Sequence, residues 1–250
     1  MNIDTILSEI RDSCKDVFGE NLVGVYVHGS IAFGCFRWDR SDVDFLVVLK
    51  DAPSLETKTA FIRDLLELTE HAPPKGLEMS VVLERDCKNF VHPCPFELHF
   101  SNSHLERIRA DTEGYCREMK GTDPDLAAHL TVTKAVGYPL CGGPVSEVFG
   151  DVPREAYLES ILFDVESAKE DILRDPVYMT LNLCRVAAYL EDGAVLSKEQ
   201  GGKWAIGHLP SEYAGLVFHA LECYAGGEKP SEDAGALTRF AEYMLSRIGF

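Results

Sequence analysis

Two aspartates, Asp42 and Asp44, stand where a polar turn runs into an apolar segment at residues 45–49. Residues i and i+2 of a β-strand point to the same face, so we expect the two carboxylates side by side. Two like charges this close repel each other unless a cation lies between them. Carboxylate oxygens at this spacing suit Mg²⁺, which also takes oxygens from a substrate phosphate. We therefore interpret Asp42 and Asp44 as magnesium ligands.

Upstream of the aspartates, an apolar segment ends in the pair Gly29-Ser30. Glycine has no side chain to block close approach, and the Gly29 amide together with the Ser30 hydroxyl can hold a phosphate. Taken alone, Gly-Ser is typical of an ordinary turn, and Asp-x-Asp is typical of a solvated entry into a strand. Because both occur at this spacing and each adjoins an apolar strand, the combination favours a site for a phosphate and a metal ion.

A third acidic residue, Glu78, interrupts the apolar segment LEMSVVL of residues 77–83. Strand alternation puts its side chain on the face opposite Leu77 and Met79. An unpaired carboxylate in the core of a sheet costs free energy, so Glu78 must face either solvent or a site. In an antiparallel or mixed sheet, beside the strand that carries the aspartates, Glu78 would join them.

Hydrophobic periodicity and turn residues indicate the elements that must position these side chains. In the first part of the chain strands alternate with helices, which indicates an α/β or α+β unit. The expected helices there span residues 3–18 and 56–70, and the expected strands span residues 22–28, 45–49 and 77–83. From residue 122 onward the hydrophobic pattern changes from alternating strands and helices to helices. Helical stretches are expected at residues 154–173, 176–191, 198–208, 211–225 and 231–248. The pattern therefore indicates an α/β or α+β unit followed by a helical domain.

Composition excludes several classes of partner. The 250 residues hold 24 Lys+Arg against 41 Asp+Glu, a formal net charge of −17. Binding to nucleic-acid backbones needs clustered Lys and Arg, and an anionic membrane surface is also disfavoured, so we expect neither as a partner. The charge permits a cationic substrate or a site that recruits metal ions. The start of the chain has no signal-peptide pattern and the eight cysteines are scattered, so we expect a cytoplasmic protein, and we expect a monomer.

The order of a Gly-Ser pair, an Asp-x-Asp pair twelve residues beyond the serine and a later strand acid resembles the polymerase-β-like nucleotidyltransferase superfamily. The resemblance is closer to one branch, the bacterial aminoglycoside adenylyltransferases that modify streptomycin and spectinomycin. It extends along most of the chain and includes LEMSVV (77–82), PFELHF (95–100), Thr133-Lys134, Gly143-Pro144 and the segment 181–210. The first pattern is specific to the superfamily, and segment 181–210 is specific to the branch.

This resemblance implies an α+β protein, with a mixed-sheet nucleotidyltransferase domain at residues 1–150 and a helical bundle domain at residues 151–250. It also implies transfer of AMP from ATP to a hydroxyl of an aminoglycoside or aminocyclitol antibiotic, with release of pyrophosphate. In those enzymes the two aspartates hold Mg²⁺ on ATP, and the strand glutamate deprotonates the attacking hydroxyl. Carried over, Asp42 and Asp44 are the metal ligands and Glu78 is the general base. The roles are chemically coherent, because phosphoryl-type transfer depends mainly on positioning and on cations that offset developing charge.

Arg185 of the helical half matches a position that the family uses for a nucleotide phosphate, and Lys198 is a second candidate for binding a phosphate. Arg185 lies in a segment that is apolar on nearly all sides, where it needs an anionic partner, either an internal salt bridge or a phosphate. Lys198 stands at the start of an expected helix, with Ser197 and Gln200 spaced as a capping box. A lysine there opposes the helix dipole unless a phosphate binds at that end, and the alternative is a solvated lysine.

Asp171 and Asp175 match acidic positions that the family uses to hold the cationic drug. Asp175 precedes Pro176 and would also be a good N-cap for the helix that follows. Asp171 falls late in a helix, where a negative charge is unfavourable, and this mismatch favours a functional role. The streptomycin-modifying members carry a tryptophan in the loop after their ELHF segment, whereas residues 101–104 here read SNSH. The sequence therefore does not single out streptomycin or any other drug.

Two alternatives to this function remain. One is the same chemistry on another acceptor, such as a lincosamide-like drug, a metabolite or a protein side chain. The other is a nucleotide-binding regulator that has lost catalysis, although the retention of Asp42, Asp44 and Glu78 speaks against it. A tRNA acceptor is disfavoured, because it would require a basic surface that the composition lacks.

Overall fold

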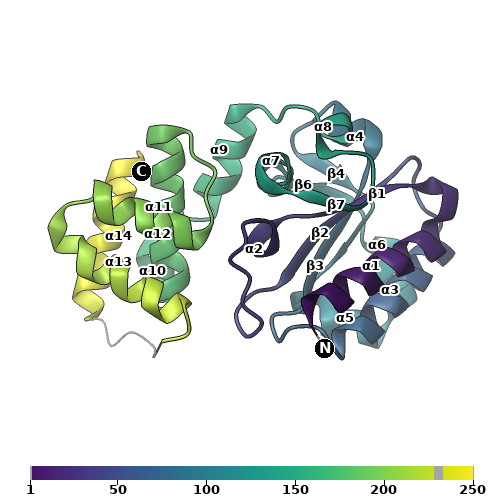
Figure 1. The fold of residues 1–250 in the computed structure, drawn as a ribbon, viewed down its shortest axis with the longest axis horizontal. Coiled ribbons are helices and arrows are strands. Elements are labelled where there is room, and N and C mark those ends of the chain that lie inside the picture. Colours follow the sequence, from purple (N-terminus) through teal and green to yellow (C-terminus); the bar gives the residue numbers. More distant parts are fainter. Residues whose placement is uncertain (1, 228–232, 250) are drawn as a thin grey trace. The chain divides into compact units, whose positions relative to one another are not determined.

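The structure is a computed structural model that describes residues 2–227 and 233–249. The chain divides into two compact units, Met1–Tyr157 and Leu158–Phe250. The first unit combines a β-sheet with helices, and the described residues of the second form helices and their connections (Figure 1). The predicted α+β class, with a mixed sheet in the N-terminal part and helices in the C-terminal part, is confirmed.

The first unit is built on a mixed sheet of five strands in the order β5-β3-β2-β1-β7. The strands are β1 Leu22–Val27, β2 Val43–Leu49, β3 Leu77–Leu83, β5 Leu98–Phe100 and β7 Tyr138–Gly142. β2 and β3 are parallel neighbours, and the other pairings in the sheet are antiparallel. The central strands are rich in β-branched residues, which favour a buried, pleated setting. β2 begins at Val43, so Asp44 lies inside the strand and Asp42 lies just before it.

Helices and short elements complete the first unit. The helices are α1 Ile3–Phe18, α2 Gly29–Ala32, α3 Leu55–Thr69, α4 Glu84–Lys88, α5 Leu105–Ala110, α6 Thr112–Glu118, α7 Leu126–Val136 and α8 Val145–Val148. The 3₁₀ turns are η1 Gly19–Asn21 and η2 Asn102–His104, and the short strands β4 Cys94–Phe96 and β6 Gly121–Asp123 pair antiparallel. The helices predicted at residues 3–18 and 56–70 are confirmed as α1 and α3.

Strand alternation divides the interior of this unit into two cores, one on each face of the sheet. Phe45 points to the core that contains the apolar residues of α1 and α3. Leu46 points to the opposite core, where it packs with Leu126 and Leu130 of α7. Asp44 precedes Leu46 by two residues and therefore shares its face. The carboxylates of the site thus lie on the α7 side of the sheet.

The second unit consists of helices around their own core, which includes the fully buried Leu183, Phe240 and Met244. The helices are α9 Arg154–Phe163, whose first turn still belongs to the first unit, α10 Ala168–Asp171, α11 Pro176–Asp192, α12 Lys198–His208, α13 Ser211–Tyr224 and α14 Ala234–Ile248. The helices predicted at residues 176–191, 198–208 and 211–225 are confirmed. The helix predicted at residues 231–248 corresponds to α14, and residues 231–232 lie outside the described residues.

The single helix predicted at residues 154–173 is wrong, because this segment forms two helices, α9 and α10. The chain turns after Phe163, where the Val165 N–H donates to the Leu162 carbonyl at 3.1 Å instead of continuing the i→i−4 ladder. Val165 is fully buried in the helical core, and Asp164 accepts a side-chain hydrogen bond from Asn182 of α11. These tertiary contacts outweigh the local helical pattern.

All eight cysteines are free thiols. Cys87, His92 and Cys94, which stand close together in the sequence, do not form a metal-binding group in the described part of the chain. Among residues 2–227 and 233–249, no helix combines the length and the apolar composition that crossing a membrane requires.

Candidate active site

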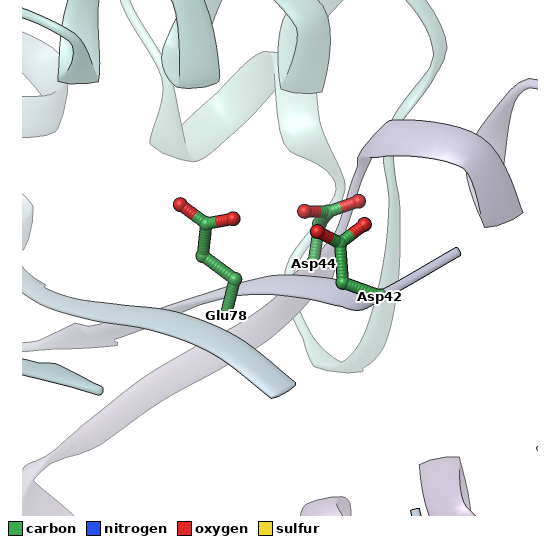
Figure 2. Close-up of side chains that lie close together, drawn as sticks. All are labelled: Asp42, Asp44 and Glu78. Atoms are coloured by element: carbon green, nitrogen blue, oxygen red, sulfur yellow. The ribbon is translucent and has the colours of Figure 1, made fainter. Parts of the chain in front are cut away.

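Three carboxylates meet at the beginning of two neighbouring strands. β2 and β3 run parallel with Asp44 directly opposite Glu78 in the register, and Asp42 lies just before β2. Each residue offers one carboxylate oxygen, and these oxygens all lie within 4.8 Å of one another. Figure 2 shows the three side chains pointing to the same side of the strands. The parallel, in-register pairing of β2 and β3 is what brings Glu78 to the two aspartates.

This donor set fits a hard divalent cation. In the described residues, the three carboxylates are the only group of three or more His, Cys, Asp or Glu side chains that could share an ion. All the donors are oxygens, which Mg²⁺ prefers. The three side chains are half-buried, so water and a phosphate can reach them. The residues present therefore fit Mg²⁺ together with a phosphate ligand.

Gly29 brings the turn after β1 against Asp44. Its φ of +59° lies in the left-handed region, which residues with a side chain rarely adopt. A Cβ at this position would lie 1.8 Å from Oδ2 of Asp44. The His28 N–H also donates to the Asp44 carbonyl at 3.1 Å, which fixes the turn to β2. Both the backbone conformation and the available space therefore require glycine here.

The Ser30 hydroxyl lies in the same turn, in α2. Its oxygen is buried and has no hydrogen-bond partner within the described residues. Leaving a buried polar group without a partner costs on the order of 1–3 kcal/mol, so such groups usually bind water or a ligand. The Gly29 amide and the Ser30 hydroxyl are therefore suited to hold a phosphate near the carboxylates.

His129 of α7 lies near the carboxylates and was not among the residues predicted from the sequence. Its Nε2 lies 3.3 Å from Oδ2 of Asp125, and its ring centroid lies 4.9 Å from that of the buried His28. Burial opposes the charged form of His129, but the hydrogen bond and the charge of Asp125 favour it. Together with the charges of Glu78 and Asp44, they raise the pKa of His129 to about 10. The spacing of Asp125 and His129, one helical turn apart, was the signal available in the sequence.

Arg185 lies on α11 in the second unit and is half-buried. Its Nε donates to Oδ1 of Asn182 at 3.0 Å, and its Nη2 donates to the same oxygen. Arg185 makes no ion pair with any described residue, so the internal salt bridge considered from the sequence is absent there. A neutral amide orients the guanidinium without neutralising it, which favours an anionic ligand. α12 packs directly on this side chain because residue 201 is glycine, where a Cβ would lie 2.8 Å from Cγ of Arg185.

Lys198 is the first residue of α12. Ser197 and Gln200 form the capping box that the sequence predicted, with hydrogen bonds of 3.1 and 3.0 Å. Nζ of Lys198 lies 4.5 Å from the centre of the Tyr178 ring of α11, a cation–π contact. This contact directs the ammonium group toward the face of α11 that also carries Arg185.

Asp171 and Asp175 lie on either side of the turn between α10 and α11. Asp175 is the N-cap of α11: its Oδ1 accepts from the Tyr178 N–H at 3.0 Å, and Pro176 follows as the first helical residue. Asp171 ends α10 and pairs with Arg174 at 3.1 Å. The cap that the sequence offered as an alternative for Asp175 is therefore present, and Arg174 offsets the unfavourable charge of Asp171. A role of either aspartate toward a drug stays a prediction.

The structure gathers the predicted residues into two groups. The first group, in the first unit, contains Gly29, Ser30, Asp42, Asp44 and Glu78. The second group, in the second unit, contains Arg185, Lys198, Asp171 and Asp175, which all lie on α11 or at the ends of its neighbours. The first group is built by strand register and a turn, and the second is built around one helix.

Two segments of the chain match known families. Residues 147–247 match the family described as aminoglycoside adenylyltransferase, C-terminal domain, and residues 7–86 match the family described as nucleotidyltransferase domain. The chain is 26% identical over 253 residues to an aminoglycoside (3'') (9) adenylyltransferase of Klebsiella pneumoniae, covering 98% of this chain and 95% of that protein. It is 28% identical over 218 residues to a spectinomycin 9-adenylyltransferase of Staphylococcus aureus, covering 85% and 81%.

The fold is similar to that of a solved spectinomycin adenyltransferase from Enterococcus faecalis, whose crystal structure was determined with ATP and spectinomycin. The TM-score is 0.83, the match covers 100% of both chains, and the sequences are 19% identical. At this identity the likeness establishes the fold. The mixed-sheet unit followed by helices is therefore an architecture that this chain shares with the solved protein.

Proposed function

The chain belongs to the aminoglycoside adenylyltransferase family, and from this membership we propose that it transfers AMP from ATP to a hydroxyl of an aminoglycoside or aminocyclitol antibiotic, releasing pyrophosphate. One observation carries the proposal. Asp42, Asp44 and Glu78 lie together beside Gly29 and Ser30, so a metal-binding group and a phosphate-binding turn adjoin each other. This is the arrangement that nucleotidyl transfer needs.

Nucleotide binding begins at the turn after β1. The Gly29 amide and the Ser30 hydroxyl take a phosphate of ATP, and the buried Ser30 oxygen gains the partner that it lacks within the described residues. Asp42 and Asp44 hold Mg²⁺, which when bound offsets the negative charge of the phosphate oxygens. Arg185 and Lys198 take further phosphate oxygens, and Arg185 has a positive charge that no described residue neutralises.

Glu78 acts as the general base, because its carboxylate lies beside those of Asp42 and Asp44, which are proposed to hold the metal ion. The acceptor hydroxyl gives its proton to Glu78 as its oxygen forms a bond to the α-phosphorus. The bond between the α-phosphorus and the bridging oxygen of pyrophosphate breaks, and pyrophosphate leaves with the electron pair. Strand register fixes Glu78 opposite Asp44, so the base and the metal ligands keep a constant separation.

A cationic antibiotic is the acceptor class that the charges favour. Asp171 ends α10, Asp175 caps the start of α11, and the chain as a whole carries a net charge of −17. Relatives from Staphylococcus aureus are spectinomycin 9-adenylyltransferases, and residues 101–104 carry no tryptophan, unlike the streptomycin-modifying members. We therefore propose spectinomycin as the first acceptor to test, with streptomycin as the comparison.

The test is pyrophosphate release from Mg-ATP across a panel of aminoglycosides and aminocyclitols, with mass spectrometry to detect an acceptor heavier by one AMP. We expect turnover with at least one aminocyclitol and a loss of about a hundredfold or more in the Glu78→Gln variant, the range typical of general bases. Glu84→Gln is the matched control, because Glu84 follows the same strand and pairs with Lys88.

Two results would contradict the proposal in different ways. Undiminished turnover in Glu78→Gln would remove Glu78 as the base while leaving the reaction intact. Absence of turnover with every member of the panel, in a protein that binds Mg-ATP, would transfer the proposal to another acceptor class such as a metabolite or a protein side chain.

A further inference from the structure

A polar network in the second unit connects the two predicted phosphate-binding cations to one carboxylate, Asp164. This residue follows α9, and its Oδ2 accepts from Nδ2 of Asn182 at 2.6 Å and from the Tyr178 hydroxyl at 3.2 Å. Asn182 in turn accepts from Arg185, and the Tyr178 ring lies against Lys198. Tyr178, Asn182 and Arg185 are spaced i, i+4 and i+7, so they share one face of α11.

We infer that Asp164 is a positioning residue for nucleotide binding, acting on Arg185 through Asn182 and on Lys198 through Tyr178. The inference rests on the proposed function, because it takes these two cations to bind the phosphates of ATP. One side chain lies between Asp164 and each cation: Asn182 for Arg185 and Tyr178 for Lys198. Asp164 is not itself a phosphate ligand, because a carboxylate and a phosphate are both negatively charged.

The Asn182 amide is the first link of this network. An amide has a donor end and an acceptor end, whereas an ionised carboxylate only accepts. Asp164 can therefore bond only the Nδ2 end of Asn182, and this leaves Oδ1 facing Arg185. Asn182 is 1% exposed, so water cannot satisfy either end in place of these partners. Without Asp164 the amide loses what fixes its orientation, and a flipped amide would present donors to a guanidinium that also only donates.

A relay through a neutral amide has a consequence for charge. If a carboxylate contacted Arg185 directly, it would form an ion pair and compete with a phosphate for the same N–H groups. Through Asn182, the guanidinium is oriented while its charge stays available to an anionic ligand. The remaining N–H groups of Arg185 have no partner in the part of the chain that the structure describes.

Tyr178 is the second link. Its hydroxyl donates to Asp164, and the face of its ring lies 4.5 Å from Nζ of Lys198. A cation–π contact requires the cation to lie over the face of the ring. The hydrogen bond that holds the Tyr178 hydroxyl therefore also sets the position of the ring face that Lys198 contacts. Asp164 thus constrains both cations at once, although it lies outside α11 and α12.

The test compares direct binding of Mg-ATP, by calorimetry without any acceptor, between the full-length wild type and Asp164→Ala. We expect Kd for Mg-ATP to rise about tenfold, with kcat and the KM for the acceptor changed less than about twofold, because only the binding of ATP is affected. Asp164→Asn keeps an acceptor oxygen for Asn182 and should recover part of the affinity. Asp164 itself is exposed, and the thermal unfolding midpoint of Asp164→Ala reports any loss of stability from the unsatisfied Asn182 amide.

Asp192→Ala is the matched control. Asp192 is also exposed, lies in the same unit and accepts a hydrogen bond at 2.6 Å, from the Trp204 indole, but this bond leads to neither cation. We expect its Kd for Mg-ATP to equal that of the wild type. If both aspartates merely fasten helices, both variants will lower the thermal unfolding midpoint and neither will change Kd, and that result overturns the inference.

A double-variant comparison tests the route through Arg185. Arg185→Gln removes the charge but keeps an N–H donor for Asn182, so we expect Asp164→Ala to weaken binding by a smaller factor in that background than in the wild type. An equal factor in both backgrounds overturns the route.

If the wild type transfers no AMP but Asp164→Ala still weakens Mg-ATP binding, the proposed reaction fails and the inference stands. If transfer occurs and Kd is unchanged in Asp164→Ala, the inference alone fails, whereas a wild type that binds no Mg-ATP removes both.

Discussion

The two units hold their functional charges by different means. In the first unit the backbone places the carboxylates: the register of β2 and β3 sets Asp44 opposite Glu78, and the turn at Gly29 lies against Asp44. In the second unit side chains place the cations: Asn182 orients Arg185 by hydrogen bonds, and the long side chains extend from helices. The first arrangement rests on backbone geometry, and the second rests on contacts between side chains.

From this difference we expect the first unit to position the reacting groups and the second unit to bind the triphosphate. Chemistry requires reacting groups held within a fraction of an ångström, which strands and tight turns provide. Binding a flexible triphosphate requires charge in the right region, which long cationic side chains provide. We therefore expect substitutions in the first unit to lower kcat, and substitutions in the second unit to raise the KM for ATP with kcat largely kept.

The largest expected effect is in Asp44→Asn. In the proposed mechanism Asp42 and Asp44 hold Mg²⁺, and replacing one of these carboxylates by an amide removes several kcal/mol of charge stabilisation. The kcat for pyrophosphate release should therefore fall by about a thousandfold. Raising the Mg²⁺ concentration should recover part of this loss. Asp39→Asn, in the same segment but exposed, should retain wild-type turnover. If Asp44→Asn keeps kcat and changes only the KM for ATP, the claim that the first unit positions the reacting groups is wrong.

The next effect in size is in Gly29→Ala, where the added Cβ would lie 1.8 Å from Oδ2 of Asp44. The turn or the carboxylate must shift, and a displacement of about 1 Å can lower kcat by about a hundredfold. Gly34→Ala is the matched control, because Gly34 also has a positive φ, +70°, but a Cβ there meets nothing within 4 Å. Both variants should lose stability in thermal unfolding, and only Gly29→Ala should lose kcat. Equal kcat in the two variants would mean that backbone strain, and not space, explains Gly29.

Most helices and strands, and the pairing of Asp42 with Asp44, could be predicted because they depend on local pattern, whereas the mixed sheet was predicted from the family resemblance. Apolar strands, turn residues and the i, i+2 spacing of Asp42 and Asp44 are properties of short segments. The partnership of Glu78 was predicted only conditionally, for an antiparallel or mixed sheet, since strand order is a long-range property. The register between β2 and β3 determines whether Glu78 joins the aspartates, because a slip of one residue would turn its side chain to the opposite face of the sheet.

The contacts around the cations could not be predicted, because they join residues that are distant in sequence. Nothing local marks Asp164 as the partner of Asn182, and the same bond helps to end α9, where the periodicity predicted a continuous helix. His129 carried only the weak signal of an aspartate one turn earlier, which is also common on solvated helices. Such side-chain networks follow from packing, which sequence pattern does not report.

Gly201→Ala tests the second unit with a smaller expected effect. A Cβ there would lie 2.8 Å from Cγ of Arg185, and overpacking of this kind typically costs about 1–3 kcal/mol. We expect the crowding to displace the Arg185 guanidinium, which is proposed to bind a phosphate of ATP. The KM for ATP should then rise about tenfold, with kcat within about twofold of the wild type. Gly207→Ala, on the same helix where a Cβ meets nothing within 4 Å, should keep the wild-type KM and gain stability. A loss of kcat in Gly201→Ala would show that the second unit also positions reacting groups.

The smallest effect separates the two roles of Asp175, which caps α11 and is proposed to contact the drug. Asparagine caps a helix about as well as aspartate, so Asp175→Asn should change the free energy of unfolding by only a few tenths of a kcal/mol, whereas Asp175→Ala should lose about 1 kcal/mol. An exposed charge contributes at most about 1 kcal/mol to binding a cation, so the KM for the antibiotic should rise about three- to fivefold in both variants. A KM that rises in Asp175→Ala alone would assign the residue to capping. A KM that rises equally in both would mean that the acidic residues of the second unit act through charge, as its cations do.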